Sequence, residues 1–128
     1  MNGQADGYGV YNWNNGEVFE GEWSNGSKEG QGTWKNIYGD SYSGSWKGNK
    51  AEGHGEYTKK NGDKYQGHWV NCLKHGKGSE TFSNGDSYIG FYALGKPHGF
   101  GVYKWNNGGI YSGEFKNGFK HGIGEWKS

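Results

Sequence analysis

A short motif, aromatic-x-Gly-x-aromatic, returns every 23 residues along the chain and constrains the fold more than any other feature. Its copies are Phe19-Gly21-Trp23, Tyr42-Gly44-Trp46, Tyr65-Gly67-Trp69, Tyr88-Gly90-Tyr92 and Tyr111-Gly113-Phe115. A second motif, Gly-x-Gly-x-aromatic, keeps the same period: Gly7-Gly9-Tyr11, Gly30-Gly32-Trp34, Gly53-Gly55-Tyr57, Gly99-Gly101-Tyr103 and Gly122-Gly124-Trp126. One copy, Gly76-Gly78-Glu80, has an acid in place of the ring, and Phe82 follows two residues later. A fixed period of this length predicts a tandem repeat whose units pack on their neighbours.

Each motif predicts a β-strand, because residues two apart in a strand share a face and the marked residues are spaced by two. The predicted strands cover residues 8–13, 18–23, 30–35, 41–46, 53–58, 64–69, 76–82, 87–92, 99–105, 110–115 and 122–127. Links of about five to seven residues are too short for parallel crossovers, so neighbouring strands must pair antiparallel. No segment has helical periodicity. The chain is therefore predicted to be all-β, a single-layer antiparallel meander of about 11 strands without a helix.

Glycines occupy two kinds of position. One set marks the links, again every 23 residues: Gly16, Gly39, Gly62, Gly85 and Gly108. If Tyr57 pairs with Tyr65, the loop between them has an odd number of residues, which fits a three-residue turn with Gly62 left-handed at a G1 bulge. Glycine within a strand weakens it unless something approaches closely. Gly44 is expected opposite Gly55, leaving room for rings to lie flat in a continuous aromatic row.

Composition agrees with such a repeat. The chain has 28 glycines and one proline, and 18% of its residues are aromatic, so any core must be built from rings. A net charge of +1 excludes a strongly basic protein that binds mainly nucleic acid. Cys72 has no cysteine with which to pair, which favours a reducing compartment and a structural thiol. The sequence has no signal-like stretch and no apolar run of roughly 18 residues, so we expect a cytoplasmic protein that is neither secreted nor transmembrane.

The paired motifs at this period resemble the MORN family, the membrane occupation and recognition nexus repeats. The resemblance covers nearly the whole chain as one array, with a partial repeat at 1–18 and five copies beginning at residues 19, 42, 65, 88 and 111. It implies an elongated, twisted sheet with an aromatic-lined groove, and scaffolding roles at cilia, cytoskeleton or membrane junctions. Family members also carry these repeats beside lipid kinase or methyltransferase domains. The sequence departs from the pattern at Glu80 and at Gly48-Asn49, where glycine precedes asparagine.

Catalytic and metal chemistry finds little support. His75, His98 and His121 recur at the repeat period, but equivalent positions lie roughly 9.5 Å apart at about 4.8 Å per strand, too far for one zinc ion. The same spacing separates Asp40, Asp63 and Asp86, which are better interpreted as turn residues. The Gly-Lys-Gly at 76–78 lacks the spacing and the helix of a phosphate-binding loop. No serine belongs to a recognisable triad motif. We predict no enzyme, no cofactor and no metal.

Three surfaces remain for a partner. The first is the aromatic face, where a peptide or helix is expected to lie along a groove of Trp23, Tyr42, Trp46, Tyr65, Trp69, Tyr88, Tyr92 and Phe115. Large exposed apolar patches mark interaction sites, and Trp and Tyr are favoured hot-spot residues. The alternative is that these rings fold onto one another as the only core available. We expect both, with packing taking the larger share.

The second surface is the opposite face, which is polar in most repeats but carries Ile89, Phe91, Phe100 and Val102 around the fourth one. Scattered apolar surface residues are normal, whereas four on adjacent strands favour a partner contact. The third is an edge of hairpin tips bearing Lys28, Lys50, Lys74, Lys96 and Lys120. It could meet anionic lipid at roughly 1 kcal/mol per lysine, although Glu29 and Glu52 share the edge and a solvated charge row is the simpler interpretation.

The ends of the array add one more expectation. Asn2-Gly3 aligns with Asn25-Gly26, so the chain opens in a hairpin tip, and both terminal strands are predicted to be unpaired edges. Such edges can add a strand from a copy of the chain or from a partner, or the array can be part of a longer one. The sequence thus favours a protein-binding scaffold in a cytoskeletal or ciliary assembly. Peripheral membrane contact through the lysine edge, or a regulatory repeat domain of a larger enzyme, are the alternatives.

Overall fold

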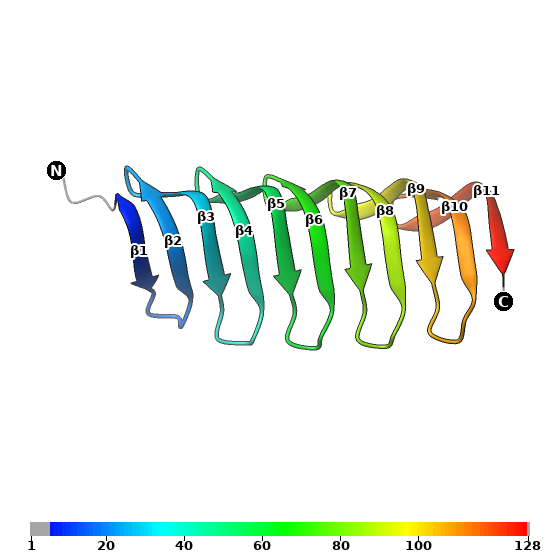
Figure 1. The fold of residues 1–128 in the computed structure, drawn as a ribbon, viewed down its shortest axis with the longest axis horizontal. Coiled ribbons are helices and arrows are strands. Elements are labelled where there is room, and N and C mark those ends of the chain that lie inside the picture. Colours follow the sequence, from blue (N-terminus) through cyan, green and yellow to red (C-terminus); the bar gives the residue numbers. More distant parts are fainter. Residues whose placement is uncertain (1–5, 128) are drawn as a thin grey trace.

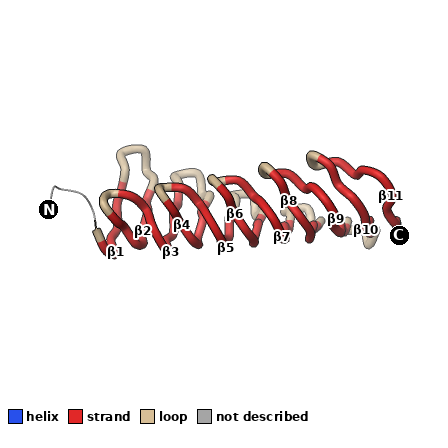
Figure 2. Tube along the Cα trace, turned by 90° about the horizontal axis from the view of Figure 1, so that it is seen from above, coloured by secondary structure: helices blue, strands red, loops and turns tan. Residues whose placement is uncertain are grey.

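The computed structural model describes residues 6–127, without the side chains of residues 121–123 and 127, so Asn2-Gly3 and the side chain of His121 lie outside it. Its strands are β1 (Gly7–Asn12), β2 (Val18–Ser24), β3 (Ser27–Lys35), β4 (Ser41–Lys47), β5 (Lys50–Thr58), β6 (Lys64–Val70), β7 (Leu73–Thr81), β8 (Ser87–Ala93), β9 (Lys96–Lys104), β10 (Ile110–Lys116) and β11 (Phe119–Lys127). They form one sheet in sequence order, with every described neighbour antiparallel (Figure 1). The strands succeed one another along the long axis in a single layer (Figure 2). The all-β meander predicted from the repeat is confirmed.

The second strand of each hairpin is longer than predicted. Strands β3, β5, β7, β9 and β11 begin three residues before the predicted starts, leaving turns of two residues at 25–26, 48–49, 71–72, 94–95 and 117–118. Both residues of each turn have positive φ, for example 50° at Asn25 and 79° at Gly26. This geometry is the primed turn whose twist matches that of the flanking strands. The reversed pair keeps the same geometry, with φ of 55° at Gly48 and 70° at Asn49. We call these connections the short turns.

The connections at the opposite edge, which we call the long turns, follow the prediction. Tyr57 pairs with Tyr65, the Gly62 amide donates to the Lys59 carbonyl at 2.9 Å, and Gly62 has a φ of 101°. Successive long turns are tied together by aspartate. The Asp63 carboxylate accepts the Ser83 backbone amide of the next turn at 2.8 Å, and this bond lowers the pKa of Asp63. Asp40 and Asp86 accept Lys60 and Asn106 amides at 2.9 Å in the same way, so all three are turn residues, as expected.

Glycine pairs let the first ring of each repeat cross the sheet. Gly44 pairs with Gly55, as predicted, and the ring of Tyr42 lies over them: a methyl group at Gly44 would come within 2.9 Å of its hydroxyl. Just beyond the pair the register shifts between Gly44 and Trp46. The Tyr42 hydroxyl donates to the carbonyl of Ser45 there at 3.0 Å. The bulge therefore supplies the acceptor that a buried tyrosine requires.

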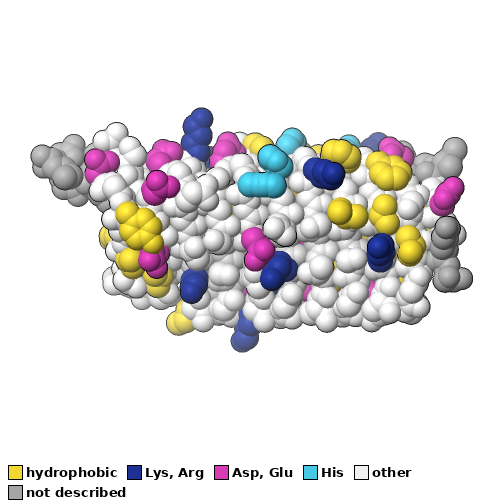
Figure 3. All heavy atoms as spheres, in the orientation of Figure 1, with side chains coloured by type: hydrophobic (Ala, Val, Ile, Leu, Met, Phe, Trp, Pro, Cys, Tyr) yellow, Lys and Arg dark blue, Asp and Glu magenta, His cyan; other side chains and the backbone are white. Residues whose placement is uncertain are grey.

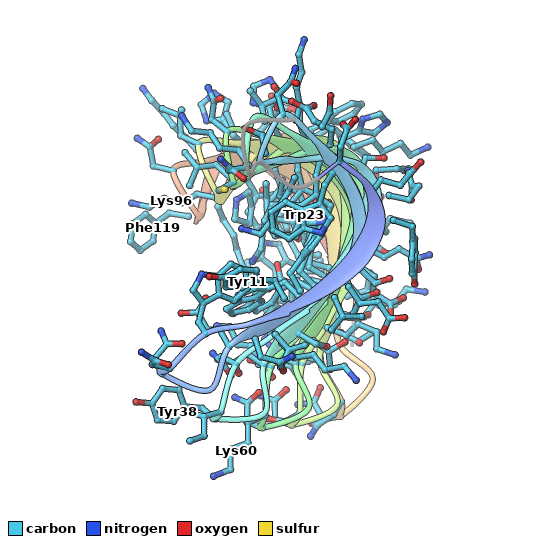
Figure 4. The ribbon with its side chains drawn as sticks, turned by 90° about the vertical axis from the view of Figure 1, so that its left-hand side faces the viewer. Tyr11, Trp23, Tyr38, Lys60, Lys96 and Phe119 are labelled. Atoms are coloured by element: carbon cyan, nitrogen blue, oxygen red, sulfur yellow. The ribbon has the colours of Figure 1, made fainter. Side chains whose placement is uncertain are left out.

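Interlocked rings hold the sheet in a curve. The ring of Tyr65 meets Trp69 of its own repeat and Tyr92 of the next one, each with centres 5.0 Å apart and at 82° and 89°. This edge-to-face contact, a favoured aromatic geometry, recurs along the sheet from Phe19 to Phe115. Seen from one end, the sheet is C-shaped, with Tyr11 and Trp23 inside the curve and Tyr38 and Lys60 at its lower arm (Figure 4). The rings line the concave face and are the core.

Candidate functional site

The predicted groove residues divide into a core row and two accessible rings. Six of the eight are buried, with at most 6% of the residue exposed: Tyr42, Tyr65, Trp69, Tyr88, Tyr92 and Phe115. Only Trp23 and Trp46 are half-buried. All eight lie on one face, but the six are mainly packing residues, of which Tyr42 and Trp69 also border a hollow. These six rings are buried because the sheet is curved, so that the rings of successive repeats cover one another on its concave face.

The rings that a partner could reach come mainly from the Gly-x-Gly-x-aromatic motif. Its aromatic residues Trp34, Tyr57 and Tyr103 are half-buried and pack against the core row. Trp34 and Tyr57 stack with ring centres 6.5 Å apart and planes at 21°. These rings were recognised in the sequence as part of a repeat motif but were not assigned to the groove. The parity of Gly-x-Gly-x-aromatic, which places the ring on the glycine face, was the signal that could have identified them.

Hollows open on the concave face of the described residues. One, of about 320 Å³, is lined by rings that include Trp34, Trp46, Tyr57 and Trp69, together with Ala51. This volume lies at the lower end of the range for ligand pockets. Another, of about 410 Å³, lies toward the C-terminal end beside Trp105, Phe115, Phe119 and Lys120. The concave face is thus an aromatic groove with separate recesses.

Hydrogen bonds fix the rings around the first hollow. The indole nitrogen of Trp46 donates to the Gly32 carbonyl at 3.0 Å, and that of Trp69 to the Gly55 carbonyl at 3.1 Å. Trp34 instead donates to the Glu17 carboxylate at 2.9 Å. That bond is the main cause of the lowered pKa of Glu17, so the carboxylate stays ionised beside the rings. The groove is preorganised and carries a fixed negative charge.

The predicted lysine edge is wrong for three of its five members. Lys28, Lys74 and Lys120 belong to β3, β7 and β11 and lie over rings of the concave face. They face inward because the long second strands place them within the ladder, as in the pairing of Trp23 with Lys28. Lys50 and Lys96 lie beside the short turns and are exposed. These two are at a different repeat position, so no single row of lysines forms.

Lys28 has the most extensive ring contacts. Its ammonium nitrogen lies 4.9 Å from the ring centre of Trp13, 5.5 Å from Phe19, 5.6 Å from Trp46 and 5.8 Å from Trp23. A cation within about 6 Å of a ring centre is attracted by the negative face of the ring. Burial lowers the pKa of Lys28, and the charge of Glu17 opposes that shift. The concave face thus already recognises ammonium groups of its own chain.

Glu80, which stands where other repeats have an aromatic residue, has both an ion-pair partner and a hydrogen-bond partner in the groove. Its carboxylate accepts from the Lys74 ammonium at 3.0 Å and from the Tyr92 hydroxyl at 2.7 Å. Burial and this carboxylate raise the pKa of Tyr92, so the phenol remains a donor. Phe82, the ring two residues later, stacks instead on Tyr103. The acid is therefore accommodated within the groove and does not leave an unpaired charge there.

The four residues of the outward apolar patch lie on the neighbouring strands β8 and β9. Ile89 pairs with Val102, and Ile89, Phe91 and Phe100 are about half exposed, at 50%, 47% and 53%. In the space-filling view, hydrophobic side chains gather on the convex face over β8 to β10 (Figure 3). A shallow hollow of about 400 Å³ lies beside the patch, near His68, Lys77 and Ile89. Whether a partner uses this patch stays a prediction.

Among the described side chains of residues 6–127, no three from His, Cys, Asp or Glu are placed to hold a metal ion, and this part of the chain has no helix of membrane-spanning length and hydrophobicity. Burial raises the pKa of Tyr42 and Tyr88 to about 12, which keeps these phenols as hydrogen-bond donors. Strands β1 and β11 are the ends of the described sheet and have one pairing partner each. Strand addition at these edges stays a prediction.

Comparison with known protein families agrees with this geometry. The family model described as MORN repeat matches residues 1–18, 19–36, 42–64, 65–87, 88–110 and 111–128. A search of curated proteins gave no match. MORN repeats are found in proteins that bind other proteins or membranes, and the repeat itself is a binding unit and not a catalytic one. Six matches that span nearly the whole chain, together with the single antiparallel sheet of hairpin repeats, establish that this protein belongs to the MORN repeat family.

Proposed function

We propose that this chain is a non-enzymatic scaffold that binds a peptide or helix of another protein in its concave aromatic groove. The observation that carries the proposal is the division of the rings into two sets. The buried set, such as Tyr65 and Tyr88, satisfies the fold, whereas Trp34, Tyr57 and Trp46 remain half-buried around a hollow. Half-buried tryptophan and tyrosine beside a recess are the residues that dominate protein interfaces.

The rigidity of the groove supports the same function. The indole of Trp46 donates to Gly32 and that of Trp34 to Glu17, so two of the partner-facing rings are held before binding. A preorganised surface loses little side-chain entropy when a partner binds. We further propose a cytoskeletal or ciliary assembly as its setting, in line with the roles that the family resemblance implies.

Site-specific photocrosslinking tests the proposal. A photoreactive phenylalanine analogue replaces Tyr57 in one variant and Phe91 in a matched control, which places the probe in the groove or on the convex patch. Crosslinks are formed in the native cell extract, and the attached peptides are identified by mass spectrometry. We expect one dominant protein adduct at position 57, lost when Trp34 is changed to Ala while circular dichroism stays unchanged.

Three outcomes would contradict the groove as the binding surface. An adduct formed at position 91 alone would assign the partner to the convex patch of Ile89, Phe91, Phe100 and Val102. If no protein adduct forms at position 57 or at position 91, the scaffold function is contradicted in that extract. Binding to anionic vesicles that weakens steeply with salt, without any protein adduct, would favour the lipid alternative.

A further inference from the structure

One position of the repeat alternates between a lysine and a residue that cannot fill the same space. It is occupied in turn by Lys28, Ala51, Lys74, Pro97 and Lys120. The five residues share one register, because each pairs with the second ring of its own repeat, as Lys28 does with Trp23 and Ala51 with Trp46. Ala51 has the smallest side chain of the five. Two repeats therefore lack this lysine, and Ala51 fills the least of its space.

Each lysine at this position lies over the first ring of its own repeat. The ammonium nitrogen is 5.5 Å from the ring centre of Phe19 for Lys28, and 5.3 Å from Tyr65 for Lys74. It also reaches a ring of the following repeat, at 5.6 Å for Trp46. The repeat geometry thus builds a cage of aromatic faces around this position, and the chain fills it with its own cation.

At Ala51 the corresponding cage is open. Three of the four rings around Lys28 have equivalents here, Tyr42, Trp46 and Trp69, and all three line the hollow of about 320 Å³ beside Ala51. The fourth ring, Trp13, corresponds to Asn36. Trp34 and Tyr57 add two further rings. The hollow thus lies where the lysine stem and ammonium of a neighbouring repeat would lie, and its walls are of the kind that hold those groups elsewhere in the same groove.

The charge around the hollow fits a cationic occupant. Glu17 lines it and has a lowered pKa, because Trp34 donates to the carboxylate at 2.9 Å. Lys28 also borders the hollow and is attracted to the Glu17 carboxylate, but its ammonium is held by four rings of the preceding cage. Aromatic faces and an ionised carboxylate together favour an ammonium group over a neutral chain of the same length.

We propose that the Ala51 hollow is a cage that binds a lysine side chain of a partner protein, in the place that Lys28 and Lys74 occupy in their own repeats. The proposal rests on the scaffold function of the groove and names the group that the groove selects. A lysine inserted from a peptide lying along the groove would fill the position between Lys28 and Lys74, so that three successive repeats hold a cation over their rings. The methylene stem packs on Trp46 and Trp69 while the ammonium group meets ring faces and Glu17.

Nuclear magnetic resonance with two small probes tests the cage. The full chain, labelled with ¹⁵N, is titrated with Nα-acetyl-lysine methylamide, whose side-chain ammonium is free. It is also titrated with the norleucine analogue, which has a neutral side chain of similar length. The indole N–H resonances of Trp46 and Trp69 are followed. We expect both to shift with the lysine probe, and the norleucine probe to bind about tenfold more weakly, a factor between those of an exposed and a desolvated cation–π contact.

Three variants separate occupancy from folding. Ala51→Lys supplies an internal lysine and is expected to abolish binding of the lysine probe, whereas Ala51→Ser leaves the hollow open and retains it. Glu17→Gln keeps an oxygen that accepts from Trp34 but removes the charge, so it should weaken binding of the lysine probe alone. This third variant tests the cage even if Ala51→Lys does not fold.

The proposal is overturned if the norleucine probe binds as tightly as the lysine probe, since the hollow would then recognise only apolar chains. It also fails if neither probe shifts the two indole resonances. If the two indole resonances shift with phosphatidylcholine vesicles but not with the lysine probe, the cage binds a lipid headgroup instead. If Ala51→Lys still forms the crosslink from position 57, the scaffold function holds and the lysine cage fails. If that crosslink never forms, the scaffold function itself fails.

Discussion

The glycine pairs under the tyrosine rings provide the sharpest test of why this sheet folds. Gly67 has an ordinary extended backbone and faces Gly78, with the ring of Tyr65 across both. A methyl group at Gly67 would lie 2.6 Å from the Gly78 Cα, 2.7 Å from the Tyr65 hydroxyl and 2.8 Å from the Lys77 carbonyl oxygen. Two of these three contacts are with the backbone of the adjacent strand. To relieve these contacts, β6 must move away from β7 and the Tyr65 ring must also shift.

The cost of Gly67→Ala can be worked out from those contacts. Overpacking of a core typically costs about 1–3 kcal/mol. A displaced Tyr65 also loses its 2.9 Å hydrogen bond to the His68 carbonyl, which contributes about 1 kcal/mol. We therefore expect Gly67→Ala to lower the free energy of unfolding by about 2–4 kcal/mol.

Gly9→Ala is the matched control. Gly9 is also a strand glycine opposite another glycine, Gly21, but a methyl group there would meet only the Trp23 ring at 3.8 Å, an ordinary contact. Replacing glycine by alanine at a compatible position stabilises a fold by about 0.4–1 kcal/mol, because the unfolded chain loses freedom. Urea denaturation followed by tryptophan fluorescence measures both variants. A loss below about 1 kcal/mol for Gly67→Ala, or an equal loss for Gly9→Ala, would refute the steric argument.

The remaining predictions concern polar contacts and use the same assay. Tyr65→Phe keeps the ring but removes the donor to the His68 carbonyl, and should cost about 1 kcal/mol; no change would mean that the bulge does not need that bond. Glu80→Gln leaves the half-buried Lys74 ammonium without its carboxylate and should cost about 1–3 kcal/mol, part of which Lys74→Met should restore in the double variant. The lowered pKa of Asp63 means that its carboxylate stabilises the fold above the ordinary carboxyl pKa and ceases to do so as the pH falls through the folded value. As the pH falls from about 5 to below the ordinary carboxyl pKa, the Asp63→Asn variant should therefore lose less stability than the parent chain. Equal loss of stability in acid by the two chains would contradict this role.

Periodicity and parity predicted most of the fold. The spacing of Tyr42, Gly44 and Trp46 is enough to place three residues on one face of a strand, and it repeats at every copy. The odd loop between Tyr57 and Tyr65 led to the left-handed Gly62, as observed. These inferences succeeded because strand parity and turn chemistry are local properties of the backbone, with a two-residue period and a defined sign of φ.

The short turns, and the inward-facing lysines that they produce, were not predicted. Asn25-Gly26 is a strong two-residue turn signal, but six residues separate the marked positions Trp23 and Gly30. Reconciling the two requires the register shift between Gly21 and Trp23, where β3 takes up extra residues. A bulge depends on both strands at once, so one strand's pattern does not reveal it. For this reason Lys28 was expected at a tip and not among the rings.

The sequence by itself determined the repeat, the strands, their antiparallel order and the face on which the rings lie, because each of these depends on residue spacing along one strand or one turn. The tertiary structure alone decided which rings remain accessible. Tyr65 and Trp34 carry the same signal of parity, yet Tyr65 is closed over by Trp69 and Tyr92 of successive repeats while Trp34 borders the hollow at Ala51. Curvature of the whole sheet sets those contacts between repeats, and it depends on the summed twist and bulges of many strands.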